Sequence, residues 1–336
     1  MLLTNTTLAQ WHSSQYLTGL CHKSVCFTLP ENQQLQLVAA DESDSAHLVI
    51  FAEGLNLEKL YAIKTALSNV LSIDYFKSGR DMGAGCAVEA KVAMDQHSDG
   101  DLNTLIEQLS VATQTDMALL THRPTLSQPG VLLMDMDSTV IGIECIDEIA
   151  KLAGVGEQVS AVTELAMQGK LDFVDSLTSR VACLADAPES ILQQVRDAMP
   201  INPGISRLLH ELRLANWKLA IASGGFTFFA DYLLERLDLD YVIANQLEIK
   251  DKRLTGKVEG DIVSAQTKAD TLTKLANQYG IDLSQTIALG DGANDLVMMK
   301  QAGLGIALHA KPLVRQQADA ALRFSAADGL LAYLRQ

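Results

Sequence analysis

The sequence predicts an α/β fold in two parts: a Rossmann-like parallel sheet core with a helical cap insertion, preceded by an α+β N-terminal domain. Three observations predict it. Residues 46–121 hold strand and helix patterns in the order β-α-β-β-α-β. From residue 131 onward apolar strands alternate with helices, which is typical of a parallel sheet. Residues 144–200 interrupt that alternation with helical patterns alone.

Length and charge limit the number of domains and the kinds of partner. A chain of 336 residues is long enough for two domains with separate cores. We place them at residues 1–125 and 126–336, with the cap at about 144–200. The formal net charge of -15 argues against a nucleic-acid partner or an anionic membrane surface. No apolar segment reaches about 18 residues, so we expect no membrane span.

The cysteines indicate the redox environment. They number five, which is odd, and no two form a CxxC pair. We therefore expect reduced thiols in a cytoplasmic protein and no disulfide framework or zinc site. Cys145 follows two aspartates closely, so a nucleophilic thiol has to be weighed. No histidine stands near it in the sequence, and a buried structural role is favoured.

The N-terminal elements are predicted from apolar periodicity. Strands are expected at residues 47–51, 71–75, 87–93 and 116–120, and helices at 56–69 and 102–109. Asp101 is a candidate N-cap for the second helix. The order is that of a ferredoxin-like sandwich, and it resembles the ACT modules that bind amino acids. A ligand-binding glycine signature is absent, so a structural or dimerising role is as well supported as an amino-acid sensor.

A segment with two prolines and a glycine, residues 122–130, leads into the first strand of the larger domain. This strand, residues 131–134, is apolar throughout and is followed by Asp135 and Asp137. Ligands of open α/β sheets bind beyond the carboxyl ends of the strands. Two carboxylates buried there need a metal or cationic neighbours. The pair alone, however, would favour an aspartate that caps the turn after the strand.

The rest of the larger domain places more polar residues at strand ends. Further strands are predicted at residues 218–222, 241–244, 286–289, 305–308 and 320–322, with a hairpin at 248–256. Helices are predicted near 205–215 and 229–237, and another opens at Lys268. Ser223 and Gly224 follow one strand, and Asp291, Asn294 and Asp295 follow another. Right-handed crossovers bring these ends to one edge of the sheet.

Four signals therefore follow one another with helices between them. They are the Asp135 and Asp137 pair, Ser223 with Gly224, Lys268, and Asp291 with Asn294 and Asp295. In this order they resemble the haloacid dehalogenase-like phosphohydrolases. A carboxylate can attack phosphorus and form an aspartyl-phosphate, which divides a slow hydrolysis into two steps. The resemblance assigns this attack to Asp135. It assigns to Asp137 the proton transfers to the leaving group and from the attacking water. The set is complete without Cys145 as a nucleophile.

The resemblance also implies a cofactor and a phosphate site. Mg²⁺ prefers oxygen ligands, and the matching ones are the carboxylates of Asp135 and Asp291 and the backbone carbonyl of Asp137. Asn294 is implied to bind substrate and, with Asp295, to orient the metal's waters or ligands. The remaining groups, which would hold the phosphate oxygens and supply positive charge, are Ser223, the Gly224 amide and Lys268.

Residues 130–312 resemble the bacterial phosphoserine phosphatases more closely. The matching stretches are Asp135–Thr139, Glu144–Ala150, Gly169–Phe173 and Ile221–Thr227, with Arg180. The resemblance implies O-phospho-L-serine as substrate and the last step of serine biosynthesis as the reaction. Arg180 would bind its carboxylate, Glu144 its ammonium group, and Phe173 would cover the site. The alternative roles are a helix-face salt bridge, a capping residue and a cap-core residue.

Three other functions remain open at this stage. One is a phosphatase of the same fold for phosphohomoserine, phosphothreonine or a phosphorylated cofactor. A second is an amino-acid sensor whose phosphatase domain is vestigial, and a third is a phosphoryl transferase. The acidic and basic residues at the strand ends argue against the second. A monomer and a homodimer are equally compatible with the sequence.

Overall fold

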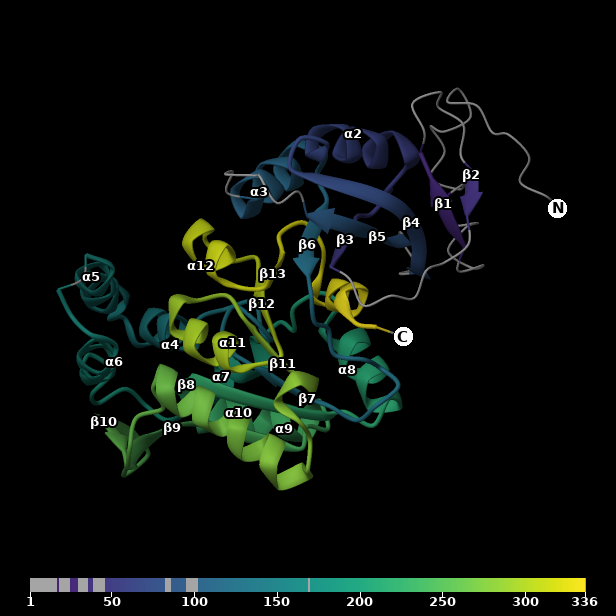
Figure 1. The fold of residues 1–336 in the computed structure, drawn as a ribbon. Helices are drawn as coiled ribbons and strands as arrows, with labels where there is room; N and C mark the ends of the chain where they lie inside the picture. Colours follow the sequence, from purple (N-terminus) through teal and green to yellow (C-terminus); the bar gives the residue numbers. More distant parts are fainter. Residues whose placement is uncertain are drawn as a thin grey trace.

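The structure is a computed structural model, and it describes residues 17, 25–29, 36–38, 46–81, 86–94, 102–168 and 170–335. Its two sheets have six and seven strands. Figure 1 shows the smaller sheet with its helices above the larger one, and the cap helices to one side. In the described part of the chain, no helix is long and apolar enough to cross a membrane.

The smaller sheet has the strand order β2-β1-β4-β5-β3-β6. Its four strands from β3 to β6 are antiparallel neighbours in the order β4-β5-β3-β6, and with α2 and α3 they form a ferredoxin-like unit. That prediction is confirmed. The bounds are β1 Cys26–Thr28, β2 Gln36–Val38, β3 His47–Phe51, α2 Leu57–Leu67, β4 Leu71–Asp81, β5 Cys86–Met94, α3 Leu102–Thr113 and β6 Asp116–Leu120.

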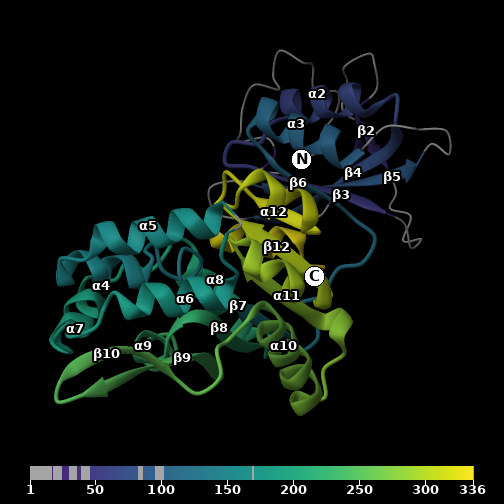
Figure 2. The same ribbon diagram turned by 90° about the vertical axis from the view of Figure 1, so that its left-hand side faces the viewer.

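The two faces of this sheet pack against different partners. Successive side chains of a strand point to opposite faces. Leu48 and Ile50 of β3 therefore face α2 and α3 in one core, whereas Val49 and Phe51 belong to the core of the larger domain. The 3-10 helix η4, Ala327–Tyr333, contributes to that second core, and Figure 2 shows the N-terminal sheet resting on the C-terminal part of the chain.

The larger sheet has the order β10-β9-β8-β7-β11-β12-β13 and is parallel except for the pairing of β10 with β9. Leu132 and Met134 of β7 face one layer, and Val131 and Leu133 face the other, so the strand is apolar throughout. The strands are β7 Val131–Met134, β8 Lys218–Phe226, β9 Tyr241–Lys250, β10 Arg253–Glu259, β11 Thr286–Gly290, β12 Leu304–Leu308 and β13 Ala320–Leu322.

Helices cover both faces of this sheet and form the cap. The cap helices are α4 Cys145–Ala153, α5 Gly156–Met167, α6 Phe173–Ala182 and α7 Ser190–Ala198. The others are α8 Ile205–Leu214, α9 Thr227–Arg236, α10 Ala265–Tyr279, α11 Leu296–Gln301 and α12 Pro312–Gln317, with short 3-10 turns η2 Leu283–Gln285 and η3 Ala293–Asp295. The α/β fold class with its parallel core is confirmed. The limits 1–125, 126–336 and 144–200 stay predictions.

Two details of the predicted strands were wrong. The strand expected at 241–244 and the first arm of the hairpin are one strand, β9, whose outer half pairs with β10 and is partly exposed. A partly exposed strand carries polar residues, so β9 lacks the continuous apolar run by which buried strands were predicted. Ser223 and Gly224 lie within β8, where they bulge out of its ladder with β9, and not beyond the strand.

The expectation of reduced cysteines is wrong at one position. Cys86, at the start of β5, is disulfide-bonded. The described cysteines that are free are Cys26, Cys145 and Cys183. A disulfide needs two cysteines about 5.5 to 6 Å apart between their Cα atoms, and spacing along the sequence does not report that distance.

Candidate active site

A cavity of about 220 Å³ lies at the carboxyl end of the parallel strands, beneath the cap. All the predicted site residues line it except Lys268 and Asp295, which lie buried behind its wall. They are Asp135, Asp137, Glu144, Phe173, Arg180, Ser223, Gly224, Asp291 and Asn294. The parallel sheet brings residues together that are more than 150 positions apart in the sequence.

Lys268 anchors the floor of the cavity. Its Nζ donates hydrogen bonds of 2.7 Å to Oδ1 of Asp135 and of 2.7 Å to Oδ1 of Asp295. The side chain is 1% exposed, and burial alone would lower its pKa. The two carboxylates outweigh that effect and hold the pKa above its ordinary value, so the ammonium group stays charged. The capping box of Ser264 and Thr267 fixes the helix start that carries it.

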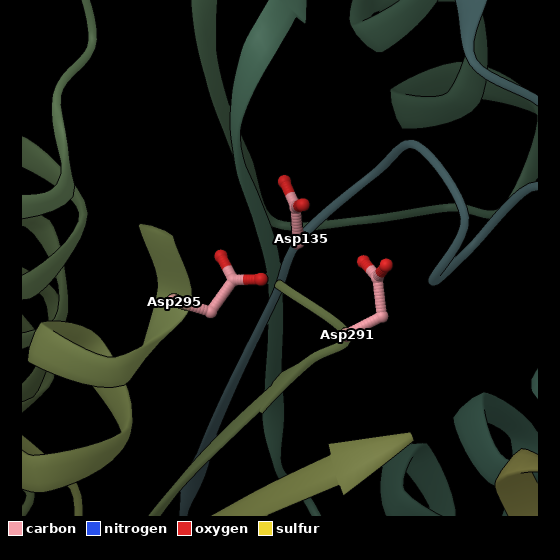
Figure 3. A group of neighbouring side chains, drawn as sticks. All are labelled: Asp135, Asp291 and Asp295. Carbon is pink, nitrogen blue, oxygen red and sulfur yellow. The ribbon is translucent and has the colours of Figure 1, made fainter. Parts of the chain in front are cut away.

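Three carboxylates meet in this region. One oxygen of each of Asp135, Asp291 and Asp295 lies within 4.8 Å of the others, and Figure 3 shows Asp135 beside the two residues from the loop after β11. Burial and the neighbouring carboxylates raise the pKa of Asp291 to about 7 and that of Asp295 to about 6. Thr139, which the sequence analysis gave no role, donates from Oγ1 to Oδ1 of Asp291 over 3.1 Å.

The oxygens of these carboxylates have unequal freedom. Both oxygens of Asp295 accept hydrogen bonds, one from Lys268 and the other from the Gly292 amide. Within the described residues, Asp135 and Asp291 each have one oxygen that accepts no such bond. One lysine, Lys268, therefore stands beside three carboxylates. One oxygen of Asp135 and one of Asp291 remain available to a ligand. A divalent cation with oxygen ligands fits this arrangement, because it would neutralise the excess charge.

Asp137 is a buried carboxylate of the cavity that forms no salt bridge with the described residues. Its Oδ1 is buried and has no hydrogen-bond partner among the described residues. Burial, followed by the charges of Glu144 and Asp135, raises its pKa well above the ordinary value. Cys145 contacts it through both thiol and backbone, and burial raises the pKa of this thiol as well. A neutral, buried thiol is a poor nucleophile, which is consistent with the structural role expected for Cys145.

The loop after Asp137 is held by a residue that the sequence did not point to. Asn202 donates from Nδ2 to the carbonyls of Ser138, Thr139 and Ile141 over 3.1, 2.9 and 3.3 Å. It thereby joins the segment that leads into the cap to the segment that returns from it. A single asparagine before Pro203 carries no recognisable motif, so only contact information could have identified it.

Ser223 and Gly224 form the opposite wall. The Ser223 Oγ accepts a 2.9 Å hydrogen bond from the Gly225 amide, which leaves the hydroxyl proton available to a ligand. Phe173, the first residue of α6, touches Gly224: a Cβ added there would lie 2.7 Å from the Phe173 Cζ. A larger residue at this position would therefore push the Phe173 ring away from the wall.

Glu144 and Arg180 complete the cavity on its cap side. Glu144 stands before α4 and accepts a 2.7 Å hydrogen bond from the Ser138 hydroxyl. Burial raises its pKa, and the Ser138 bond and the charge of Arg180 oppose that rise. The Nε of Arg180 is buried without a partner, and within the described residues Arg180 forms no salt bridge. The helix-face salt bridge considered for Arg180 is therefore not present.

Comparison with known proteins places this cavity in a family. The model of the haloacid dehalogenase-like hydrolases matches residues 132–300, a range that includes every predicted site residue. The chain is 55% identical over 236 residues to a phosphoserine phosphatase of Vibrio cholerae, which corresponds to 70% of this chain and 72% of the relative.

Solved structures of phosphoserine phosphatases are also similar to this chain. A probable phosphoserine phosphatase from Vibrio cholerae, in an unliganded form, has a TM-score of 0.71 at 46% identity, with 86% of each chain covered. A phospho-aspartyl intermediate analogue of phosphoserine phosphatase has a TM-score of 0.59 at 40% identity and covers 62% of this chain and 100% of that one.

Proposed function

This chain belongs to the phosphoserine phosphatase family of the haloacid dehalogenase-like hydrolases, and we propose that the residues of its cavity divide the family reaction among themselves as follows. The reaction is the hydrolysis of O-phospho-L-serine to L-serine and phosphate, the last step of serine biosynthesis. The observation that carries the assignment of roles is the contrast within one cavity between Asp135, bound to Lys268, and Asp137, which is buried without a charge partner.

Asp135 is the nucleophile and Asp137 the acid and base. An Asp135 oxygen forms a bond to phosphorus while the bond from phosphorus to the serine oxygen breaks. The raised pKa of Asp137 favours its protonated form, which gives the proton to the departing alkoxide. In the second step Asp137 takes a proton from water as the water oxygen attacks phosphorus, and Asp135 is released with inorganic phosphate.

A magnesium ion fits beside these residues. The Asp135 and Asp291 carboxylates and the backbone carbonyl of Asp137 would hold it, and Asn294 and Asp295 would orient its surroundings. When bound, Mg²⁺ supplies positive charge to the phosphoryl oxygens. Lys268 adds a second positive charge, while the Ser223 hydroxyl and the Gly224 amide donate hydrogen bonds to the same oxygens.

The cap side recognises the amino acid. The Arg180 guanidinium, with its unpartnered Nε, would bind the substrate carboxylate, and Glu144 would bind the ammonium group. Phe173 would close the cavity over the substrate and exclude water.

The test is phosphate release from L-phosphoserine, phosphothreonine, phosphohomoserine and an aryl phosphate, each with Mg²⁺ and with EDTA. We expect metal-dependent activity with a strong preference for L-phosphoserine.

The Arg180→Ala variant should raise KM for L-phosphoserine by about 10- to 100-fold, because a charged hydrogen bond contributes about 1.5–3 kcal/mol. KM for the aryl phosphate should change little. The exposed Arg236→Ala on α9 is the control; equal losses on both substrates would contradict carboxylate recognition.

The wider setting is also a proposal. We propose a domain of residues 1–125, a phosphatase domain of 126–336 and a cap at about 144–200. The free Cys26, Cys145 and Cys183 support a cytoplasmic location, against which the disulfide of Cys86 counts, so thiol alkylation in intact cells is the deciding measurement. Leu37 and Val38 are exposed on the edge strand β2, which supports a homodimer to be tested by light scattering.

A further inference from the structure

One buried asparagine outside the cavity connects two of the groups assigned to phosphate binding. Asn245 lies on β9 and is 1% exposed. Its Nδ2 donates a 2.8 Å hydrogen bond to the Gly224 carbonyl, and its Oδ1 accepts one of 2.8 Å from the Val263 amide. Both polar atoms of the side chain thus bind backbone groups, at Gly224 and at Val263, which lie 39 positions apart in the sequence.

The first contact compensates for an interruption of the sheet. The β8–β9 ladder pairs Ala222 with Ile243 and then Phe226 with Asn245, so three residues of β8 lie opposite one residue of β9. A bulge of this kind leaves backbone groups without their ladder partners. The Asn245 side chain replaces the missing partner of the Gly224 carbonyl.

Fixing that carbonyl fixes a hydroxyl in the cavity. The carbonyl of Gly224 and the amide of Gly225 belong to one planar peptide group. The Gly225 amide donates to the Ser223 Oγ over 2.9 Å, which determines how the Ser223 hydroxyl can point its own proton. Both Gly224 and Gly225 lack side chains, so the backbone itself offers little resistance to rotation of this peptide.

The second contact ties the same peptide to the lysine. Val263 immediately precedes Ser264, the N-cap of α10, and Lys268 lies in the first turns of that helix with its Nζ on Asp135. We propose that Asn245 is a positioning residue, which sets the Ser223 hydroxyl at the correct distance from Lys268 for a phosphoryl group. The proposal rests on the phosphatase function given above.

Substitution by aspartate tests this with little change of shape. The ionised carboxylate that N245D introduces could still accept from the Val263 amide, but its second oxygen would repel the Gly224 carbonyl. We expect N245D to raise KM for L-phosphoserine and the inhibition constant of inorganic phosphate about tenfold at pH 8, equivalent to about 1.4 kcal/mol. A protonated carboxyl group can donate to the carbonyl, so the deficit relative to the wild type should shrink as the pH falls.

The controls separate this role from a general loss of stability. N277D makes the same chemical change on the exposed side of α10 and should leave both constants unchanged. N245A lacks donor and acceptor, and its deficit should not depend on pH. If N245D and N245A lower the melting temperature but keep the wild-type KM and phosphate inhibition constant, Asn245 is structural and the proposal is wrong. An inactive wild-type chain would instead contradict the phosphatase function itself.

If N245D does not fold, the comparison of N245A with N245S gives the same decision. A serine side chain is shorter than asparagine and has one polar atom in place of two, so it cannot bridge both segments as the amide does. N245S should therefore lie between the wild type and N245A in phosphate inhibition. Equal inhibition constants in all three proteins would overturn the proposal.

Discussion

Two buried aspartates of this protein have opposite surroundings. Asp116, at the start of β6, is 1% exposed and accepts hydrogen bonds from the amides of Arg323, Phe324 and Ser325 over 2.8, 3.1 and 2.9 Å. Asp137 is buried in the cavity, and one of its oxygens has no partner among the described residues. The first joins the N-terminal domain to the C-terminal segment, and the second faces the substrate space.

The difference distinguishes a structural carboxylate, Asp116, from Asp137, which we propose to be catalytic. Asp116 exchanges its hydration for three amide donors, and the neighbouring Glu107 likewise accepts from Arg315 and Arg323. A satisfied buried group of this kind stabilises the fold. The carboxylates of the cavity repel one another, and only Asp135 among them pairs with Lys268, so they lower stability unless a ligand or a metal binds. Two of the buried side-chain atoms that have no hydrogen-bond partner among the described residues, Oδ1 of Asp137 and Nε of Arg180, lie in this cavity.

The largest expected effect is that of Asp135→Asn. Loss of the nucleophile should lower kcat by about four to six orders of magnitude, as for other enzymes whose covalent step is removed. The fold should persist, because an amide at this position reduces the negative charge of the cluster. Steady-state kinetics measure kcat, and circular dichroism measures whether the fold persists. Near-wild-type turnover would refute the assignment of Asp135.

The same substitution at Asp116 and at Asp137 should change the free energy of unfolding in opposite directions. Asp116→Asn places an amide donor against backbone donors and should cost about 2 kcal/mol of unfolding free energy, with kcat per folded molecule unchanged. Asp137→Asn should keep or raise the unfolding free energy and abolish turnover. Urea unfolding at pH 7.5 without metal gives both numbers. A loss of stability in both variants would remove the distinction drawn above.

Metal binding should relieve the strain of the cavity. We expect Mg²⁺ to stabilise the wild type by about 2.7 kcal/mol at a concentration 100 times its Kd. The gain should disappear in Asp291→Asn, which loses a ligand, and persist in Asp116→Asn. Thermal unfolding across a Mg²⁺ titration, with EDTA as the zero point, is the measurement. Stabilisation of Asp291→Asn to the wild-type extent would place the metal elsewhere.

The smallest effect concerns pH. The pKa of Glu144 is raised, chiefly by burial, so its carboxylate should become neutral on acidification at a higher pH than usual and lose its attraction for the substrate ammonium. KM for L-phosphoserine should therefore rise as the pH falls, about tenfold more than KM for an aryl phosphate, which shares the phosphate titration. Glu144→Gln should remove this extra dependence. Parallel pH profiles for the two substrates would contradict the role of Glu144.

Local pattern in the sequence predicted most of the strands and helices, although it missed β1, and the family resemblance supplied the roles of the cavity residues. The apolar run before Asp135 predicted a buried strand, and the rule that ligands bind at the carboxyl edge of a parallel sheet then grouped Asp135, Ser223 and Asp291. Lys268, at the start of a helix, was added through the family resemblance. The β-α-β-β-α-β order similarly predicted the ferredoxin-like unit, because strand and helix periods are properties of adjacent residues.

Contacts between distant segments depended instead on how the chain packs. The bulge in β8, the bonds of Asn245 and Asn202, the docking of β3 on η4 and the partners of Asp116 have no counterpart in periodicity or motif. An asparagine or aspartate has the same sequence signature whether it is solvated or buried. Its role follows from which backbone groups the fold leaves without partners, and that is fixed only when the chain has packed.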